Sequence, residues 1–355
     1  MSYKRIAIIR TDRIGEVILT TPLAAVLKQQ YPDSNITFFT SDLAYEVLQF
    51  APQIDTTEIF DTIQKPTFKS FLKFLDQLRH SGYDLAVVAN PHKYSHLAVS
   101  LAGIKTRVGF NRKWGKYLLT HSINDTRAEG KIHELDANLK LLQCLGISAE
   151  RNRPSLVVSA AEKNALKSKL SGQGINFKWP IISFHPGSSF IYKRWPREYF
   201  KELIKKIQGE YNVEICLNGD VSEKYLCKEI AINPILPLHS LAGTLTVREL
   251  VIFLSLSQLV IANDSGPMHI ADALGTNLIA IFGRGKEGTG PNRWGPTGKN
   301  SYIFHKIPQQ CTVCVNEACA YNFECLKMIT PEEVFNGIKA TQLIPVEFKK
   351  PQAKE

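Results

Sequence analysis

The stretch 258–276, QLVIANDSGPMHIADALGT, has the residues best suited to chemistry. An apolar run at Leu259–Ala262 predicts a buried parallel strand, which stops at Asn263–Gly266 before a helix that opens at Pro267. Asp or Ser suits the helix cap and Pro suits the first helical position. The backbone amides of residues 265–268, with the positive end of the helix dipole, would bind an anion. Taken alone, the stretch also fits an ordinary capped turn between a strand and a helix.

A second loop, SFHPGSSFIYKRWP at residues 183–196, follows another predicted strand. Gly187 allows a ligand close to the backbone, and the hydroxyls of Ser188 and Ser189 can donate hydrogen bonds to phosphate oxygens. Lys193 and Arg194 add positive charge. A solvated loop would explain each feature separately. Together with 258–276, they favour a site for a pyrophosphate.

A third loop, LNGDVSE at 217–223, also follows a strand. A carboxylate in this position can accept hydrogen bonds from ribose hydroxyls, as the acidic residue of dinucleotide-binding domains does. Glu223 is our candidate for that contact. Asp220 suits a helix cap equally well.

Near the N-terminus, a predicted strand at Arg5–Ile9 leads into RTDRIGE at 10–16 and then a helix. A dinucleotide-binding domain would have three spaced glycines here, and only Gly15 is present. The loop has two carboxylates, Asp12 and Glu16. Glu16, at the start of the helix, is a candidate general base. The alternative is structural, with Asp12 as a cap and Glu16 favoured by the helix dipole.

Two other types of chemistry lack their usual motifs. Residues 283–288, GRGKEG, match G-x-G-x-x-G, but the helix breakers in TGPNRWGPTGKN follow where a helix should open, so we predict a loop and no nicotinamide cofactor. The chain has no Asp-x-Asp pair for a divalent metal on a nucleotide diphosphate. Lysine and helix amides can supply the same electrostatic stabilisation.

Four of the seven cysteines cluster near the C-terminus, and the first two have the spacing of metal ligands. The second pair lacks the repeated C-x-x-C of common zinc sites. We expect either free thiols or a structural zinc ion at Cys311, Cys314, Cys319 and Cys325.

The elements that must position these loops alternate between strand and helix, which predicts an α/β fold with parallel sheets covered on both faces. The predicted strands are Arg5–Ile9, Ile36–Phe39, Leu85–Ala89, Ile181–Phe184, Val213–Leu217, Leu259–Ala262 and Leu278–Phe282. The predicted helices include Val17–Gln30, Phe68–His80, Leu135–Leu145, Glu198–Gln208 and Arg248–Leu256.

The length of 355 residues favours two domains. The turn-forming stretch 171–180, SGQGINFKWP, is the predicted linker. We therefore expect one doubly wound domain at 1–172 and a second at 178–330. A C-terminal helix and a basic tail follow at 331–355, with the tail disordered after Pro345.

The net charge of +10 favours an anionic partner. Between residues 105 and 131 there are seven basic residues (Lys105, Arg107, Arg112, Lys113, Lys116, Arg127 and Lys131) and two acidic ones (Asp125 and Glu129). Without a recognisable nucleic-acid module, nucleic acid ranks below a phosphorylated substrate or an anionic membrane face. No signal peptide or membrane span is recognisable, so we expect a cytoplasmic protein, peripheral at most on the inner face of the cytoplasmic membrane.

In their order and spacing, these motifs resemble those of the ADP-heptose:lipopolysaccharide heptosyltransferases, glycosyltransferase family 9. The resemblance extends over nearly the whole chain. The segments that carry it are RTDRIGEVILTTPLAAVLK, RVGF, HELDANLKLL, HPGSS, KRWP, NDSGPMHIADALGT, IFG, NRWGPTG and the cysteine-rich run before ITPEEV. It implies the GT-B fold, two doubly wound Rossmann-like domains that face each other across a cleft. It also implies that the domain at 1–172 binds the acceptor and the domain at 178–330 binds the nucleotide sugar.

The resemblance also implies an inverting, metal-independent transfer of heptose from ADP-L-glycero-D-manno-heptose to the anionic inner core of lipid A. Glu16 occupies the position where the family usually has an aspartate as the catalytic base. The side chain of Glu is one methylene longer than that of Asp, so Asp12 is the alternative base. The implied donor-binding residues are Ser188, Ser189, Lys193, Asp264, Ser265, Gly266, Met268 and His269, and the implied acceptor-binding residues are Arg107, Arg112, Lys113 and Lys116.

Three other functions stay open: a transferase for another activated sugar, a nucleotide-sugar epimerase, and a protein that binds a nucleotide sugar without catalysis. The substitution of Glu for Asp is compatible with the last of these.

Overall fold

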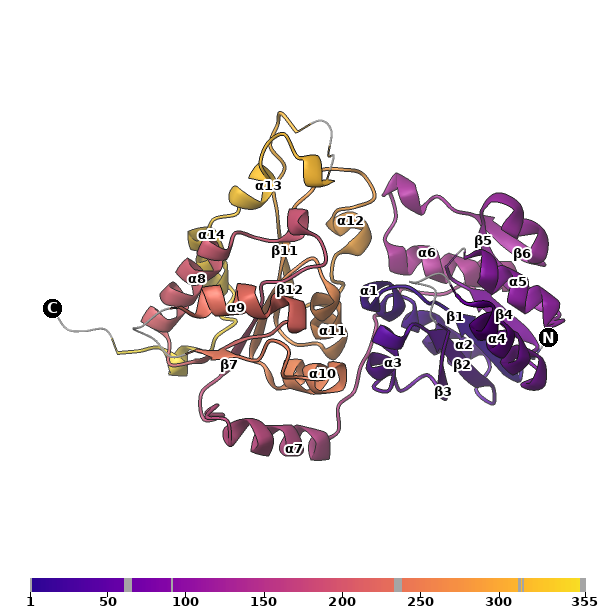
Figure 1. The fold of residues 1–355 in the computed structure, drawn as a ribbon, viewed down its shortest axis with the longest axis horizontal. Helices are drawn as coiled ribbons and strands as arrows, with labels where there is room; N and C mark the ends of the chain where they lie inside the picture. The colour runs from indigo at the N-terminus through magenta and orange to yellow at the C-terminus, as the bar shows by residue number, and fades with distance from the viewer. Residues whose placement is uncertain are drawn as a thin grey trace. The chain divides into compact units, whose positions relative to one another are not determined.

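The structure is a computed structural model that describes residues 2–60, 66–90, 92–232, 238–311, 314 and 316–351, without the side chains of Lys113, Trp114 and Asn316. The chain folds into two compact units, Met1–Val157 and Val158–Glu355. Each contains one parallel six-stranded sheet, and Figure 1 colours the first unit indigo to magenta and the second magenta to yellow.

The sheet of the first unit has the strand order β3-β2-β1-β4-β5-β6. Alternate residues of β1 are buried on opposite faces: Ala7 and Ile9 join a core with helices α4 and α5, while Ile6 and Ile8 are also fully buried. Both faces are therefore covered, as expected for a doubly wound sheet. The elements of this unit are β1 (Arg5–Ile9), α1 (Ile14–Ile18), α2 (Thr21–Gln30), β2 (Asn35–Thr40), α3 (Asp42–Leu48), β3 (Thr56–Ile59), α4 (Phe68–His80), β4 (Leu85–Val88), α5 (Lys93–Leu101), β5 (Thr106–Asn111), η1 (Lys113–Leu118), β6 (His121–Asn124), η2 (Arg127–Glu129), α6 (Glu134–Lys140) and η3 (Leu141–Leu145).

The second unit has the strand order β12-β11-β10-β7-β8-β9. One core of this unit joins one face of the sheet to α8, α9 and α14, while α10 and α11 pack together and α11 packs on β10 and β11. Its elements are α7 (Ala160–Ser171), β7 (Ile181–His185), η4 (Ile191–Lys193), α8 (Arg197–Glu210), β8 (Glu214–Leu217), η5 (Val221–Glu223), α9 (Lys224–Ala231), β9 (His239–Ser240), α10 (Val247–Leu256), β10 (Leu259–Asn263), α11 (Gly266–Leu274), β11 (Leu278–Phe282), α12 (Pro291–Trp294), β12 (Ser301–His305), η6 (Asn316–Ala318), α13 (Glu324–Lys327), α14 (Pro331–Ala340) and η7 (Val346–Phe348).

The predicted helix Val17–Gln30 is two helices, α1 and α2. Pro22 has no N–H to continue the helical ladder, and the hydroxyl of Thr21 donates instead to the carbonyl of Ile18 at 2.8 Å. The break turns α1 into a separate five-residue helix that carries Glu16.

Helix α7 belongs to the second unit, although the sequence pattern placed residues 160–171 in the first domain. It packs on α10 through two ion pairs, Lys169–Glu249 at 2.6 Å and Arg248–Glu162 at 2.5 Å. These contacts place the division between the units at Val157, upstream of the predicted linker 171–180.

The prediction of a disordered tail after Pro345 is wrong for residues 346–351. The amide of Asn212 donates to the carbonyl of Phe348, and the amide of Lys350 donates to that of Glu210, both at 2.8 Å. Lys349 also pairs with Glu210 at 2.9 Å. These bonds attach the tail to the end of α8.

Candidate functional site

The order of the strands locates one crevice in each sheet. In an open parallel sheet, ligands bind outside the carboxyl ends of the strands, where the strand order reverses. The reversal falls between β1 and β4 in the first unit and between β7 and β10 in the second. The loops selected from the sequence, 10–16, 183–196 and 263–266, follow β1, β7 and β10.

In the second unit, the loops after β7 and β10 are bonded together. Nζ of Lys193 lies 2.7 Å from Oδ2 of Asp264, whose side chain is buried. The hydroxyl of Ser188 donates to the backbone oxygen of Asp264 at 3.2 Å. Three residues of the predicted donor site are therefore neighbours, although Asp264 is 71 positions from Lys193 and 76 from Ser188 in the chain.

Asn263, which the sequence analysis did not select as a site residue, holds these loops in position. Its side-chain amide donates to the carbonyl of Pro186 at 2.8 Å, and its Oδ1 accepts from the amide of Trp195 at 3.0 Å. It is fully buried, so both bonds are shielded from water. The side chain of Arg194 adds two bonds to the carbonyl of Ser188, at 2.6 and 2.8 Å.

The N-terminus of α11 has the geometry of an anion site. Ser265 is the N-cap residue, but it makes no side-chain cap bond, because its hydroxyl donates to the carbonyl of Asn263 at 3.0 Å. The first-turn amides are therefore left without a side-chain acceptor, at the positive end of the helix dipole. Lys193 and Ser188 lie beside this turn through their bonds to Asp264.

Glu223 is buried and held from two sides. Its Oε2 accepts from the amide of Asp220 at 3.0 Å and lies 3.9 Å from Nε2 of His185. A Cβ on Gly187 would come within 1.7 Å of Oε1 of Glu223. The loop after β7 and η5 therefore meet at Gly187. The helix cap predicted at Asp220 is also present, since its side chain accepts from the amides of Ser222 and Glu223.

We expect Gly187→Ala to destabilise the second unit, because the new methyl group would displace the Glu223 carboxylate from its capping bond. A lost cap costs about 1–2 kcal/mol, which lowers the melting temperature by a few degrees. Gly209→Ala in α8 is the matched control, since a Cβ there meets nothing within 4 Å. Thermal unfolding of both variants should place Gly187→Ala below the wild type and Gly209→Ala at or above it; equal melting temperatures would contradict the steric argument.

The remaining predicted donor residues differ in how exposed they are to solvent. Ser189 is exposed, and Ser265 and Gly266 are half-buried. Met268 is fully buried and His269 is 4 % exposed, so both pack inside the unit beneath the first turn of α11. Their contact with a donor stays a prediction.

In the first unit, the loop after β1 is anchored by a buried charge network that sequence reasoning missed. Arg10 Nε lies 2.7 Å from Oδ1 of Asp12, and Arg10 Nη1 lies 3.0 Å from Oε1 of Glu134. Arg127 shares the same Glu134 oxygen at 2.8 Å and also pairs with Asp125 at 2.7 Å. The only sequence signal was the presence of Arg10 and Glu134 in two of the characteristic segments, RTDRIGE and HELDANLKLL.

These charges act on the acidity of Glu16. Burial, followed by the negative charge of Asp12, raises the pKa of Glu16 to about 7, against the opposing effect of Arg10. Asp12 is held in an ion pair by Arg10. A carboxyl group whose pKa lies near neutral pH is better suited to general base catalysis than one held as an ion pair. The geometry favours Glu16 over Asp12.

Arg112, Lys113 and Lys116 follow β5, at the same sheet edge as the Glu16 loop, whereas Arg107 lies near the amino end of β5, at the opposite edge. Arg107 is used internally, because it donates to the carbonyls of Leu118 at 2.7 Å and Ile104 at 2.5 Å. Arg112 and Lys116 are exposed. The side chain of Lys113 lies outside the described residues.

Family membership follows from a match to a family model. The model for glycosyltransferase family 9 (heptosyltransferase) matches residues 71–323, well over half of the chain. The chain belongs to glycosyltransferase family 9. It is therefore a glycosyltransferase, as the motifs predicted.

Full-length relatives extend this match to the N-terminal loop. The family 9 chain is 25% identical to lipopolysaccharide heptosyltransferase 2 of Escherichia coli (strain K12), over 96% of this chain and 99% of that one. It is 26% identical to lipooligosaccharide heptosyltransferase 2 of Haemophilus ducreyi, over 85% of this chain and 89% of that one.

Solved structures confirm the GT-B fold of this family 9 enzyme. E. coli ADP-heptose lps heptosyltransferase II aligns with a TM-score of 0.78 at 23% identity, over 96% of this chain and 98% of that one. A family 9 glycosyl transferase from Veillonella parvula aligns with a TM-score of 0.81 at 20% identity, over 96% and 97%.

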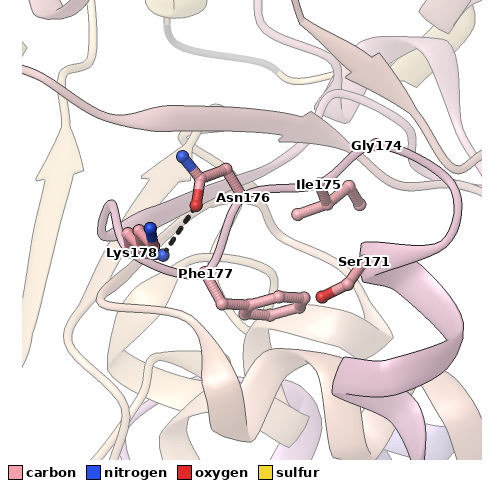
Figure 2. Close-up of a pocket in the computed structure, with 6 residues that line it drawn as sticks. All are labelled: Ser171, Gly174, Ile175, Asn176, Phe177 and Lys178. Carbon is pink, nitrogen blue, oxygen red and sulfur yellow. Dashed lines mark hydrogen bonds between the residues drawn. The ribbon is translucent and has the colours of Figure 1, made fainter.

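A hollow of about 530 Å³ in the family 9 enzyme lies away from these loops. It precedes β7, so it is at the amino edge of the second sheet, whereas the site loops leave the carboxyl edge. Figure 2 shows its lining, with the bond from the amide of Lys178 to Asn176. The lining residues are Ser171, Gly174, Ile175, Asn176, Phe177 and Lys178.

The four clustered cysteines of the family 9 enzyme form no disulfide. Within the part of the chain that the structure describes, no three His, Cys, Asp or Glu side chains come together as metal ligands. Zinc at these cysteines stays a prediction. Among the described helices, none is both long and apolar enough to cross a membrane.

Proposed function

We propose that this enzyme transfers heptose from ADP-L-glycero-D-manno-heptose to the inner core of lipopolysaccharide, with inversion and without a metal ion. The observation that carries the proposal is the junction of Lys193, Asp264 and the first turn of α11 at the reversal point of the second sheet. Relatives named as lipopolysaccharide heptosyltransferases, and a solved structure of an E. coli heptosyltransferase with ADP, support the donor and the acceptor class.

The donor half of the reaction needs positive charge on the diphosphate. The ammonium of Lys193 and the first-turn amides of α11 supply that charge from protein nitrogens. Ser188 adds a hydroxyl in the same place, and Glu223 is close enough to the loop after β7 to bind a ribose.

The acceptor half needs a base. Glu16 takes the proton from an acceptor hydroxyl, whose oxygen forms a bond to the anomeric carbon of the heptose. The bond from that carbon to the phosphate oxygen breaks on the opposite face, and ADP leaves with the bonding electrons. Lys193 and the helix amides stabilise the negative charge that grows on the leaving phosphate.

The acceptor is anionic and bound at a lipid surface, so we place the enzyme in the cytoplasm, peripheral on the inner face of the membrane. Arg112 and Lys116 are exposed, and Tyr117, next to Lys116, is 78 % exposed. Exposed cations beside an exposed aromatic ring suit an anionic interface. Arg112, Lys113 and Lys116 are the proposed contacts to acceptor phosphates and carboxylates.

The decisive experiment is mass spectrometry of truncated core lipid A after incubation with the enzyme and ADP-heptose. We expect a mass gain of one heptose. No gain with ADP-heptose but a gain with another activated sugar would change the donor. An isomerised donor in the absence of acceptor would indicate an epimerase, and ADP binding without turnover would indicate a binding protein.

A further inference from the structure

The end of β4 and the first turn of α5 contain polar side chains without hydrogen-bond partners. In the described residues, Oδ1 of Asn90, Nδ1 of His92 and both ring nitrogens of His96 are buried and unpartnered. Asn90 is only 6 % exposed and His96 is fully buried. Such atoms are uncommon in folded proteins because they lose their bonds to water, and each one needs an explanation.

These side chains lie beside the candidate base. β4 pairs with β1 at the reversal point of the first sheet, with Ile9 opposite Val88. The amide nitrogen of Asn90 donates to the hydroxyl of Thr11 at 3.0 Å, directly before Asp12. The charge of Asp12 also acts on His92 and opposes the fall of its pKa. Asn90 and His92 therefore share the crevice with the Asp12–Glu16 loop.

The charge state of this group suits a neutral ligand. Burial and then Lys93 lower the pKa of His92, and burial and then His92 lower the pKa of His96 to about 4. Both imidazoles are uncharged at neutral pH. A neutral imidazole and a carboxamide can each donate to and accept from a hydroxyl, whereas a phosphate oxygen only accepts.

His96 connects this group to the basic segment η1. A Cβ on Gly115 would lie 2.4 Å from Nδ1 of His96, so the backbone of η1 rests directly on the ring. Gly115 precedes Lys116, one of the proposed contacts to acceptor phosphate. The polar atoms of Asn90 and His92 and the exposed ammonium of Lys116 therefore lie on adjoining segments. A ligand with both sugar hydroxyls and a phosphate or carboxylate would require this arrangement.

We propose that Asn90 and His92 form an acceptor subsite that binds sugar hydroxyls and holds the attacking hydroxyl beside Glu16. His96 is a positioning residue that supports His92 and the η1 backbone. This inference rests on the proposed function, since it assigns the sugar of the same acceptor.

The test compares His92→Phe with His92→Gln in steady-state transfer to truncated core lipid A. His92→Phe keeps a flat ring but loses both ring nitrogens, so we expect the acceptor KM to rise about tenfold, as for one lost hydrogen bond to substrate. The donor KM should stay within about twofold, because the donor contacts lie on the other unit. His92→Gln, which can still bind a hydroxyl, should recover most of the loss.

The matched control is His80→Phe, since His80 is an exposed histidine of the same unit. It should leave both KM values unchanged. An unchanged acceptor KM in His92→Phe, or an equal loss in His92→Phe and His92→Gln, would overturn the subsite.

A second measurement separates this inference from the proposed function. Deacylated core oligosaccharide is added to the wild-type enzyme, and the ring resonances of His92 are followed by NMR, with His80 as the reference. We expect His92 to shift and His80 to stay. If the wild type transfers heptose but His92 does not respond, the subsite is wrong and the function stands. If His92 responds but no sugar is transferred, the function is wrong and the subsite stands.

Discussion

Glu16→Gln should abolish heptose transfer while it leaves ADP affinity unchanged. A positioned general base contributes about 10²–10⁴-fold to a rate, and the amide of Gln cannot accept the proton. ADP affinity should not change, because the residues proposed to bind the diphosphate belong to the second unit. The measurement is kcat for transfer, together with calorimetric titration of ADP.

The pH dependence of the wild type gives a second test of Glu16. Burial, and then Asp12, raises the pKa of Glu16 to about 7, so the base loses its proton as the pH rises through that value. We therefore expect kcat/KM to fall below pH 7 and to level off above it. Asp12→Asn removes the negative charge that raises this pKa, so its profile should move to lower pH.

The raised pKa of Glu16 also makes the stability of the folded state depend on pH. The folded state binds the proton of Glu16 more tightly than the unfolded state, in which the pKa is near 4.5. Stability is therefore lost as the pH rises from about 4.5 through 7, where the buried carboxyl becomes charged. Glu16→Gln removes this loss, so the variant should gain melting temperature over the wild type at pH 8 and gain little at pH 5.

Glu129→Gln is the matched control, since the side chain of Glu129 is exposed and its carboxylate lies 3.3 Å from Nζ of Lys131. It should keep wild-type activity, pH profile and stability. If Glu16→Gln still turns over at the wild-type rate, the base is elsewhere, and Asp12→Asn then becomes the variant to measure.

The central strands and the long amphipathic helix were readable from sequence because their burial is regular. β1 (Arg5–Ile9), β11 (Leu278–Phe282) and α4 (Phe68–His80) have the predicted bounds. The sequence analysis did not find β3, β5, β6, β9 or β12. β3, β6, β9 and β12 are the edge strands of the two sheets, and none of them is fully buried. β3, β6 and β9 also have polar residues, such as TTEI in β3 and HSIN in β6, so they lack the apolar run that marks a buried strand.

Candidate site residues could be selected from sequence where the chemistry is local, and not where it depends on distant pairs. Strand ends and charged side chains within short segments indicated Lys193 and Glu16 as candidates, and the family resemblance implied Asp264. The bond from Asn90 to Thr11 joins residues 79 apart, and the ion pair of Arg10 with Glu134 joins residues 124 apart. No periodicity within one segment reports such contacts. To predict these contacts one must know the strand order, because it decides which loops are neighbours.

Lys193→Met is the variant with the second largest expected effect. The loss of the ammonium should weaken ADP binding by about 10- to 100-fold, the usual contribution of a hydrogen bond to a charged group. It should also lower kcat, because the charge on the leaving phosphate grows during the reaction and Lys193 stabilises it most at the transition state. The measurements are ADP titration and kcat with saturating donor.

One structural effect must be separated from this chemical one. Asp264 is buried, and its partner at 2.7 Å is the same ammonium, so Lys193→Met alone leaves a buried carboxylate without its cation. The double variant Lys193→Met/Asp264→Asn removes both charges, and its melting temperature should return toward that of the wild type. Its ADP affinity and kcat should stay low, since no cation has been restored for the diphosphate. Lys201→Met, at an exposed ion pair in α8, controls for the loss of a lysine. A well-folded double variant that binds ADP as tightly as the wild type would remove Lys193 from the donor site, and the amides of α11 would then have to hold the diphosphate alone.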